Sequence, residues 1–267
     1  MAAPGPGTIR FGGNTSCVEI KAGDQLIICD AGTGIRPLGE SLVRRMKGRP
    51  IEATVLLSHL HWDHYIGLPF FRPLYDGKNR FVVAGPRAAG MDFGSALSCA
   101  MRPPYFPVPI AVLPSRMRFK TISPRPFKVG TVRIVPMELN HPGGAMGWRF
   151  YFPNRRSVVH VTDNEPSSQN KMKRLVNWMQ GADILIHDAQ YTPASYLQRM
   201  GWGHSPFTYP LTLAADAGIP RVVFFHFDPA DNDKCLSDIQ RQARAWARKQ
   251  GIKIRCDLAR EGTSIVL

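Results

Sequence analysis

The chain has 267 residues, of which 44% are hydrophobic and 20% are charged, and its formal net charge is +14. This is an ordinary globular composition, long enough for a sizeable core, and no segment is apolar over the length of a membrane span. A membrane-spanning protein is therefore excluded, while the positive charge favours an anionic partner without separating a nucleic acid from a small phosphate ester.

The N-terminus and the cysteines both indicate a reduced, cytoplasmic location. The opening residues, Met1-Ala-Ala-Pro-Gly-Pro-Gly, lack the apolar core of a signal peptide. Five cysteines are scattered without paired spacing, and Cys17 and Cys29 fall in predicted strands, where they are expected to be small buried hydrophobes.

Short strands are predicted at residues 17–21 and 26–30, and a helix over 35–46. Asp30 ends the second strand and is followed by Ala31-Gly32-Thr33-Gly34. An acid in this position is typical of a turn. The glycines do not form a phosphate loop, because no Lys-Ser/Thr pair follows them.

The densest cluster of metal-ligating residue types follows an apolar run, 54–57, that predicts a buried strand. In extended backbone, alternate side chains share a face, so His59, His61 and Asp63 can point into one pocket. A change of backbone direction would then turn His64 towards a second centre. Imidazoles and a carboxylate at this density suit a zinc-like cation.

The remainder of the chain alternates strands and helices around one proline-rich stretch. Residues 86–126 predict an irregular insertion, acting either as a lid or wall of the active site or as a surface connection or partner contact. Further strands are predicted at 80–84, 117–122, 132–136, 147–152, 157–163, 183–187, 221–225, 253–256 and 264–266, and helices at 168–180, 203–217 and 231–250.

Strand-rich halves, each followed by helices, predict two mixed sheets packed face to face with helices outside. Because no linker divides the chain, we expect a single domain over residues 1–267.

The pattern His59-x-His61-x-Asp63-His64 resembles the signature of the metallo-β-lactamase-fold hydrolases. His141, Asp163 and His226 follow at predicted strand ends, in the order of that family's later ligands. The resemblance implies a four-layer αββα sandwich with two divalent metal ions. It assigns His59, His61 and His141 to one ion, Asp63, His64 and His226 to the other, and Asp163 to a bridge between them.

Two later segments, His187-Asp188 and Gly203-His204-Ser205, resemble stretches of the branch that contains ribonuclease Z and related phosphodiesterases. The resemblance implies that His204 holds a phosphate oxygen or protonates the leaving group, the alternative being an ordinary histidine at a helix start. Asp63 is also counted as catalytic. Supporting roles behind the ligands are expected for Asp30, His187 and Asp188.

The resemblance favours a dinuclear-metal phosphodiesterase that cleaves small phosphodiesters, such as cyclic nucleotides, with metal-activated hydroxide. His141 and Asp163 are only 22 positions apart, which leaves no room there for the long arm with which tRNA-processing enzymes usually grip tRNA. Three alternatives stay open: a ribonuclease Z-like tRNA 3′-endonuclease, a lactonase or β-lactamase-type hydrolase, and a non-catalytic metal-binding protein.

The expected cofactors and partners follow from the same residues. Zinc is the expected metal, with Mn²⁺ or Fe²⁺ as alternatives. The expected substrate is an anionic small molecule or nucleotide, nucleic acid is a second candidate partner, and no membrane partner is expected. The resemblance also implies a homodimer.

Overall fold

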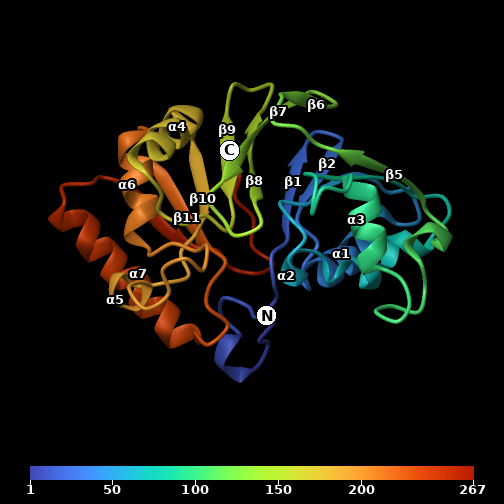
Figure 1. The fold of residues 1–267 in the computed structure, drawn as a ribbon, viewed down its shortest axis with the longest axis horizontal. Helices are drawn as coiled ribbons and strands as arrows, with labels where there is room; N and C mark the ends of the chain where they lie inside the picture. The colour runs from blue at the N-terminus through green and yellow to red at the C-terminus, as the bar shows by residue number, and fades with distance from the viewer. The chain divides into compact units, whose positions relative to one another are not determined.

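The computed structural model describes residues 1–267, which divide into two compact units. The first unit comprises Met1–Ala2 and Asn14–Arg125, and the second comprises Ala3–Gly13 and Pro126–Leu267. Each unit has its own sheet and its own hydrophobic core, and in Figure 1 the first sheet is coloured blue to green and the second green to red. A single domain over residues 1–267 stays a prediction.

The sheet of the first unit has five strands in the order β1-β2-β3-β4-β5. β1 and β2 are antiparallel, and the other neighbours are parallel. The strands are β1 (Val18–Ala22), β2 (Gln25–Cys29), β3 (Glu52–Leu56), β4 (Arg80–Gly85) and β5 (Arg116–Thr121). Because β2 and β3 are parallel, the residues that follow them, Asp30 and Ser58, emerge at the same edge of the sheet.

The crossover between β2 and β3 is α1 (Ile35–Met46), which has the bounds expected from the sequence. Ile35 and Leu42 are buried, and Leu38 packs against the same core, so one face of the helix covers the sheet. Arg44 and Arg45 lie in the last turn, where positive charge favours the helix dipole. Lys47 then adopts a left-handed conformation that ends the helix.

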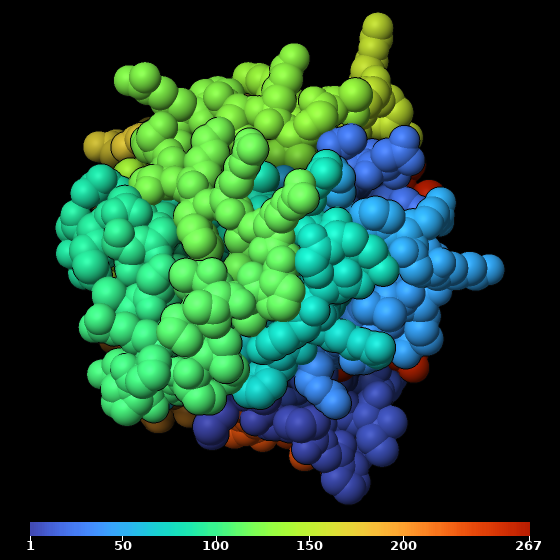
Figure 2. Space-filling model, turned by 90° about the vertical axis from the view of Figure 1, so that its right-hand side faces the viewer, coloured from blue at the N-terminus to red at the C-terminus, as the bar shows by residue number.

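Residues 86–126 are more regular than predicted. Besides β5, which matches the strand predicted at 117–122, they contain α3 (Phe93–Ala100) and a short η4 (Ile110–Val112). The Asp92 side chain accepts a hydrogen bond from the Ser95 amide and so caps α3, a signal that the surrounding prolines obscured. Figure 2 shows this segment, in green, on the surface of the first unit. The Tyr105 side chain is exposed.

The sheet of the second unit has seven strands in the order β12-β11-β10-β9-β8-β7-β6. The neighbours from β6 to β9 are antiparallel, and those from β9 to β12 are parallel. The strands are β6 (Phe127–Val129), β7 (Val132–Leu139), β8 (Ala145–Tyr151), β9 (Ser157–Val161), β10 (Ile184–Asp188), β11 (Arg221–Phe225) and β12 (Arg255–Leu258).

Helices of the second unit cover this sheet, and α6 and α7 lie beside β10, β11 and β12 (Figure 1). The helices are α4 (Gln169–Met179), α5 (Pro193–Tyr196), α6 (Thr208–Asp216) and α7 (Asp233–Lys249), with a 3₁₀ turn η1 (Pro6–Thr8). In α7 the apolar residues Leu236, Ile239 and Ala243 keep helical spacing and are buried in the core. Asn232 caps this helix by accepting from two backbone amides.

Two predicted boundaries in the second unit are wrong. Residues 264–266 form no strand, and the Val266 side chain is exposed, so these residues bury no apolar face that would hold them in a sheet. The helix expected from Gly203 begins only at Thr208, because Ser205 instead hydrogen-bonds to Asp188 and Asn164.

Candidate metal centre

The first group of predicted ligands lies on the loop that leaves β3. The backbone is extended only as far as His61 (φ −73°, ψ 147°), and a short helix, α2 (Trp62–Tyr65), starts at the next residue. The expectation that Asp63 continues the extended stretch is therefore wrong, because the His64 amide donates to the carbonyl of His61 and closes a helical turn. This turn places Oδ2 of Asp63 3.4 Å from Nε2 of His64.

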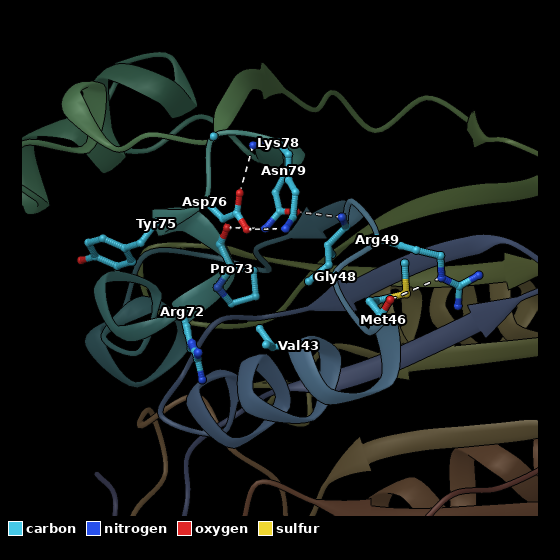
Figure 3. Close-up of a pocket in the computed structure, with 12 residues that line it drawn as sticks. Val43, Met46, Gly48, Arg49, Arg72, Pro73, Tyr75, Asp76, Lys78 and Asn79 are labelled. Atoms are coloured by element: carbon cyan, nitrogen blue, oxygen red, sulfur yellow. Dashed lines mark hydrogen bonds and ion pairs between the residues drawn. The ribbon is translucent and has the colours of Figure 1, made fainter.

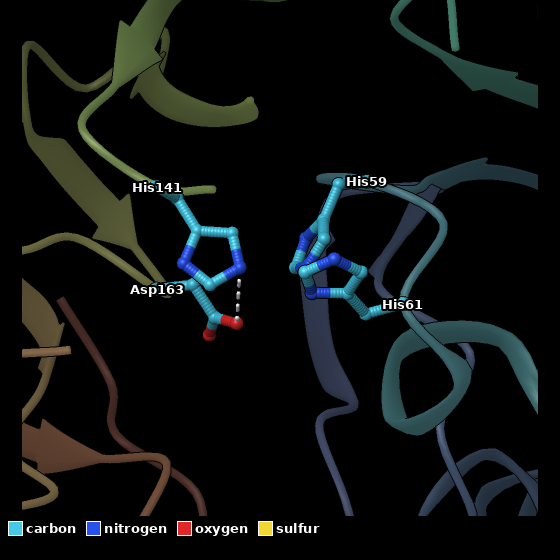
Figure 4. Close-up of side chains that lie close together, drawn as sticks. All are labelled: His59, His61, His141 and Asp163. Atoms are coloured by element: carbon cyan, nitrogen blue, oxygen red, sulfur yellow. Dashed lines mark ion pairs between the residues drawn. The ribbon is translucent and has the colours of Figure 1, made fainter. Parts of the chain in front are cut away.

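The imidazoles of this loop lie close together. The ring centroids of His59 and His61 are 4.4 Å apart, and those of His59 and His64 are 4.2 Å apart. Figure 4 shows His59 and His61 projecting from the loop side by side. His59 and His64 are buried, whereas Asp63 is partly exposed.

Asp30 holds this loop from the end of β2. Its Oδ1 accepts a hydrogen bond from the Ser58 amide at 2.7 Å, and its Oδ2 accepts from Oγ of Ser16 at 2.8 Å. Nδ1 of His64 lies 2.9 Å from the same Oδ2, which leaves Nε2 directed at Asp63. The supporting role of Asp30 stays a prediction, and the structure supplies the hydrogen bond to His64 that such a role needs.

Gly67 closes the motif by a close backbone approach. Its amide donates to the carbonyl of Ala31 at 3.0 Å, and a Cβ at this position would lie 2.0 Å from the carbonyl oxygen of Gly32. Any side chain there would push the metal-ligand loop away from the strand end that supports it.

The second unit carries the other predicted ligands at the ends of its strands. His141 follows β7, Asp163 follows β9 and His226 follows β11. Oδ2 of Asp163 lies 3.6 Å from Nε2 of His141, shown as a dashed line in Figure 4, and Oδ1 lies 3.3 Å from Nε2 of His226. One carboxylate thus faces two imidazoles, one with each oxygen, while Thr162 donates to Oδ1 at 2.7 Å.

Three of the predicted site residues have strained backbones. Asp30, Asp163 and His226 have φ angles of 61°, 30° and 52°, in the left-handed region that non-glycine residues seldom occupy. Each lies at or just beyond the end of a strand. Such conformations persist where the surrounding structure enforces them, and they concentrate at functional sites.

His204 lies beside the same carboxylate. Its ring stacks on that of His226, with centroids 5.1 Å apart, and the candidate ligand atoms of Asp163, His204 and His226 lie within 4.8 Å of one another. The sequence marked His204 as catalytic. The structure also puts it within reach of an ion held by Asp163 and His226.

Asp188 is buried and contacts His204, whose Nδ1 lies 3.3 Å from Oδ2 of the carboxylate. Burial acts to raise the pKa of Asp188, but hydrogen bonds from His187 and His204 and their charges lower it below its ordinary value. The His187 ring also reaches Asn164, with Nε2 3.3 Å from the amide nitrogen. Supporting roles for His187 and Asp188 stay predictions.

The distances between these atoms fit a bound divalent cation. Two ligands about 2.0–2.1 Å from a tetrahedral ion are separated by roughly 3.4 Å. The Asp63–His64, Asp163–His141 and Asp163–His226 pairs, at 3.4, 3.6 and 3.3 Å, all match this spacing. The donors are imidazole nitrogens and carboxylate oxygens, which suit zinc and similar metals.

The cysteines play no part in this set. All five are unbridged, and burial together with the nearby Asp30 carboxylate raises the pKa of the Cys17 and Cys29 thiols. Neutral thiols are poor metal ligands, so the buried Cys29 and the partly buried Cys17 act as packing groups.

A surface cavity of about 380 Å³ in the first unit is a separate feature, lined by α1 and the 72–79 segment (Figure 3). None of the predicted site residues lines it. Two of its three cations are paired with neighbouring carboxylates, Arg72 with Glu40 at 2.9 Å and Lys78 with Asp76 at 3.0 Å, and the third, Arg49, donates to the Met46 carbonyl. This cavity is therefore distinct from the predicted metal site.

The fold and these side chains define a class of protein. A family model described as "Beta-lactamase superfamily domain" matches residues 25–227, so the chain belongs to this superfamily. Ribonuclease Z from Metallosphaera sedula is 23% identical over 260 residues, a match that covers 82% of this chain and 83% of that protein.

Solved structures show the same fold. The metallo-β-lactamase fold protein YhfI from Bacillus subtilis superimposes with a TM-score of 0.70 at 17% identity, covering 98% of this chain and 95% of that one. A diphosphatase from the PhnP family gives a TM-score of 0.66, also at 17% identity, covering 95% of this chain and 84% of that one. The predicted family and fold class are confirmed, and the chain is a metal-dependent hydrolase of this family.

None of the seven helices is both long and apolar enough to cross a membrane.

Proposed function

We propose that the chain hydrolyses small phosphodiesters, such as cyclic nucleotides, with two divalent metal ions. The observation that carries this proposal is Asp163, whose two carboxylate oxygens each face a different imidazole at ligand-to-ligand distance. A bridging carboxylate of this kind is what a dinuclear hydrolytic site needs. The ligands proposed for the two ions are His59, His61, Asp63, His64, His141, Asp163 and His226.

The ions would provide Lewis acidity and lower the pKa of a water molecule, as two-metal sites do in phosphodiester hydrolysis. The protein's own part is to orient the ligands through Asp30 and to deliver a proton through His204. The Asp188 carboxylate lies 3.3 Å from Nδ1 of His204 and stabilises the protonated imidazole. His204 can then protonate the leaving oxygen.

One feature supports a small substrate over tRNA. The 22 positions from His141 to Asp163 are taken up by β8, β9 and their turns. This stretch has no arm of the kind that grips a large RNA. A net charge of +14 suits any phosphate-bearing substrate.

A ribonuclease Z-like tRNA 3′-endonuclease is the second candidate. It is favoured by the sequence relatives, such as the Metallosphaera sedula protein, that are named Ribonuclease Z. Zinc as the resident metal, a homodimer and a cytoplasmic location are also part of the first proposal, and the histidine-rich ligand set supports zinc. Metal analysis and light scattering test the first two.

The deciding experiment compares substrates and variants in one panel. Protein reloaded separately with Zn²⁺, Mn²⁺ or Fe²⁺ is assayed on bis(p-nitrophenyl) phosphate, cyclic mononucleotides, precursor tRNA and a β-lactam. We expect turnover of the small diesters and its loss in Asp163→Ala. Asp183→Asn is the matched control, because Asp183 belongs to the same unit and binds only Arg156 and the Ser157 amide.

Efficient cleavage of precursor tRNA without turnover of small diesters would replace this proposal with the second candidate. Bound metal without activity on any substrate would indicate a non-catalytic metal-binding protein.

A further inference from the structure

Glu165 is a buried carboxylate that no motif in the sequence marks. It lies two residues after Asp163, and only 8% of its surface is exposed. Its own amide donates to the carbonyl of Asn140 at 2.8 Å, so its backbone is tied to the residue that precedes His141. A charged group so far removed from water needs strong partners.

Those partners lie in the turn before His204. Oε1 of Glu165 accepts from the Gly201 amide at 2.6 Å, and Oε2 accepts from the Gly203 amide at 3.0 Å. Oε1 also accepts from the Tyr196 hydroxyl at 3.0 Å. One carboxylate therefore clamps both ends of the turn 201–203, and charge-assisted bonds of this kind are stronger than neutral ones.

The clamped turn contacts a proposed metal ligand directly. The Gly203 carbonyl lies 2.9 Å from Nδ1 of His141, so Nδ1 donates its proton there and Nε2 carries the lone pair. Nε2 is the atom that faces Asp163. Gly203 has a φ angle of 86°, and a Cβ there would lie 2.1 Å from Nδ1 of His141, so the contact requires glycine.

We propose that Glu165 is a positioning residue that fixes the tautomer and orientation of His141 through the Gly201–Gly203 turn, and so sets the metal affinity of the second unit. The same turn leads into His204, so its placement depends on Glu165 as well. This inference rests on the proposed function only in taking His141 as a ligand.

The chemistry of the clamp explains why a carboxylate is needed. Two backbone amides point at the side chain, and only a carboxylate has acceptors alone on both of its atoms. Glutamine keeps the shape but turns an NH₂ group towards one of the amides. Aspartate keeps the charge but is one methylene too short to bridge both ends of the turn.

The test measures metal binding and histidine protonation in Glu165→Gln and Glu165→Asp. Zn²⁺ affinity is determined by competition with a chromophoric chelator, and the His141 tautomer by ¹⁵N-detected imidazole NMR, with His141→Asn to assign the signal. We expect Zn²⁺ affinity to fall about 10–100-fold in Glu165→Gln, with a smaller fall in Glu165→Asp. The Nδ1-protonated signal of His141 should weaken in parallel.

Matched variants separate positioning from general stability. Asp183→Asn also removes the charge of a partly buried carboxylate that accepts from a backbone amide in the same unit, and it should leave Zn²⁺ affinity within about twofold of wild type. Tyr196→Phe removes one donor and keeps the clamp, so it too should change affinity little. Wild-type Zn²⁺ affinity and tautomer in folded Glu165→Gln would overturn the proposal.

If Glu165→Gln does not fold, the Zn²⁺ affinity and the His141 tautomer of Glu165→Asp test the proposal instead. Neither readout depends on turnover. A wild-type protein that binds Zn²⁺ but cleaves no diester would remove the proposed function and leave the role of Glu165 standing.

Discussion

The two units hold their predicted ligands in different ways. In the first unit, four predicted ligands lie within six positions of one loop, and Asp30, at the end of β2, fixes this loop through the Ser58 amide and His64. In the second unit the corresponding residues are spread from His141 to His226. The first group is contiguous in sequence and is fixed by the end of one neighbouring strand, whereas the second requires the ends of β7, β9 and β11 to come together.

The sheet register brings the second group together. β9, β10 and β11 are parallel neighbours, with Val161 paired to His187 and His187 paired to Phe224. Their carboxyl ends therefore meet at one edge, where Asp163, Asp188 and His226 follow in turn. A shift of one strand by a single residue would turn the side chains of that strand to the other face and separate its site residue from the other two.

The largest effect is expected at Asp163, on which the second group converges. Asp163→Ala should lower kcat/KM on bis(p-nitrophenyl) phosphate on the order of 10⁴-fold, because several kcal/mol of metal-based stabilisation are lost. Metal content by mass spectrometry should fall alongside. Full activity would show that the two imidazoles facing Asp163 do not form a catalytic site.

His204 should matter for turnover but not for metal content. His204→Ala should lower kcat about 10²–10³-fold, the usual contribution of a positioned general acid. We expect unchanged metal stoichiometry and a KM within a few fold. Loss of metal together with activity would instead mark His204 as a ligand, which its distance to Asp163 and His226 also permits.

Substitution of Asp30 tests whether metal binding by the ligand loop of the first unit depends on the hydrogen bonds of this carboxylate. Asp30→Asn should weaken metal binding about 10–100-fold, because Nδ1 of His64 loses its anionic partner. Chelator competition measures this change. An equal loss of metal affinity in Asp163→Ala and Asp30→Asn would contradict this expectation. The different ways in which the two units hold their ligands would then have no effect on metal binding.

Asp188 should make the stability of the fold depend on pH in the acidic range. Its pKa is lowered in the folded protein, because hydrogen bonds from His187 and His204 outweigh burial. The carboxylate therefore stabilises the fold fully above its unfolded pKa of about 4, and this contribution is lost as pH falls through the folded value. Denaturant titrations of Asp188→Asn and wild type should differ at pH 7 and converge in acid.

The smallest effect concerns the scaffold alone. Asn232→Ala removes the cap of α7, where the side chain accepts from the Lys234 and Cys235 amides. The free energy of unfolding should fall by about 1 kcal/mol, with kcat and metal content unchanged. A change in either would show that α7 is coupled to the ligands of the second unit.

Much of the scaffold could be predicted because its signals are local. The bounds of α1 follow from the apolar spacing of Ile35, Leu38 and Leu42, and the strands from their apolar runs. The helical turn α2 could not be predicted, because it is only four residues long and is fixed by a hydrogen bond from the distant Ala31 amide to the His64 carbonyl.

The candidate site was predictable as a set of residue types but not as a set of contacts. Glu165 gives no sequence signal, because its partners Gly201 and Gly203 lie 36 and 38 positions away and are backbone groups. His204 and Asp188 were marked only by resemblance. These two residues are in direct contact, as a general acid and its supporting carboxylate need to be. The contact depends on the bridge between Tyr191 and Pro206, which lie close to Asp188 and His204 in the sequence.

The left-handed backbone at Asp30 has a consequence for the effect of glycine at this position. Glycine would relax a strain of about 1–2 kcal/mol but would also delete a buried carboxylate. The Ser58 amide and the Ser16 hydroxyl would then lose their acceptor, at a cost of about 1–3 kcal/mol each. The side chain therefore stabilises a backbone conformation that its own backbone disfavours.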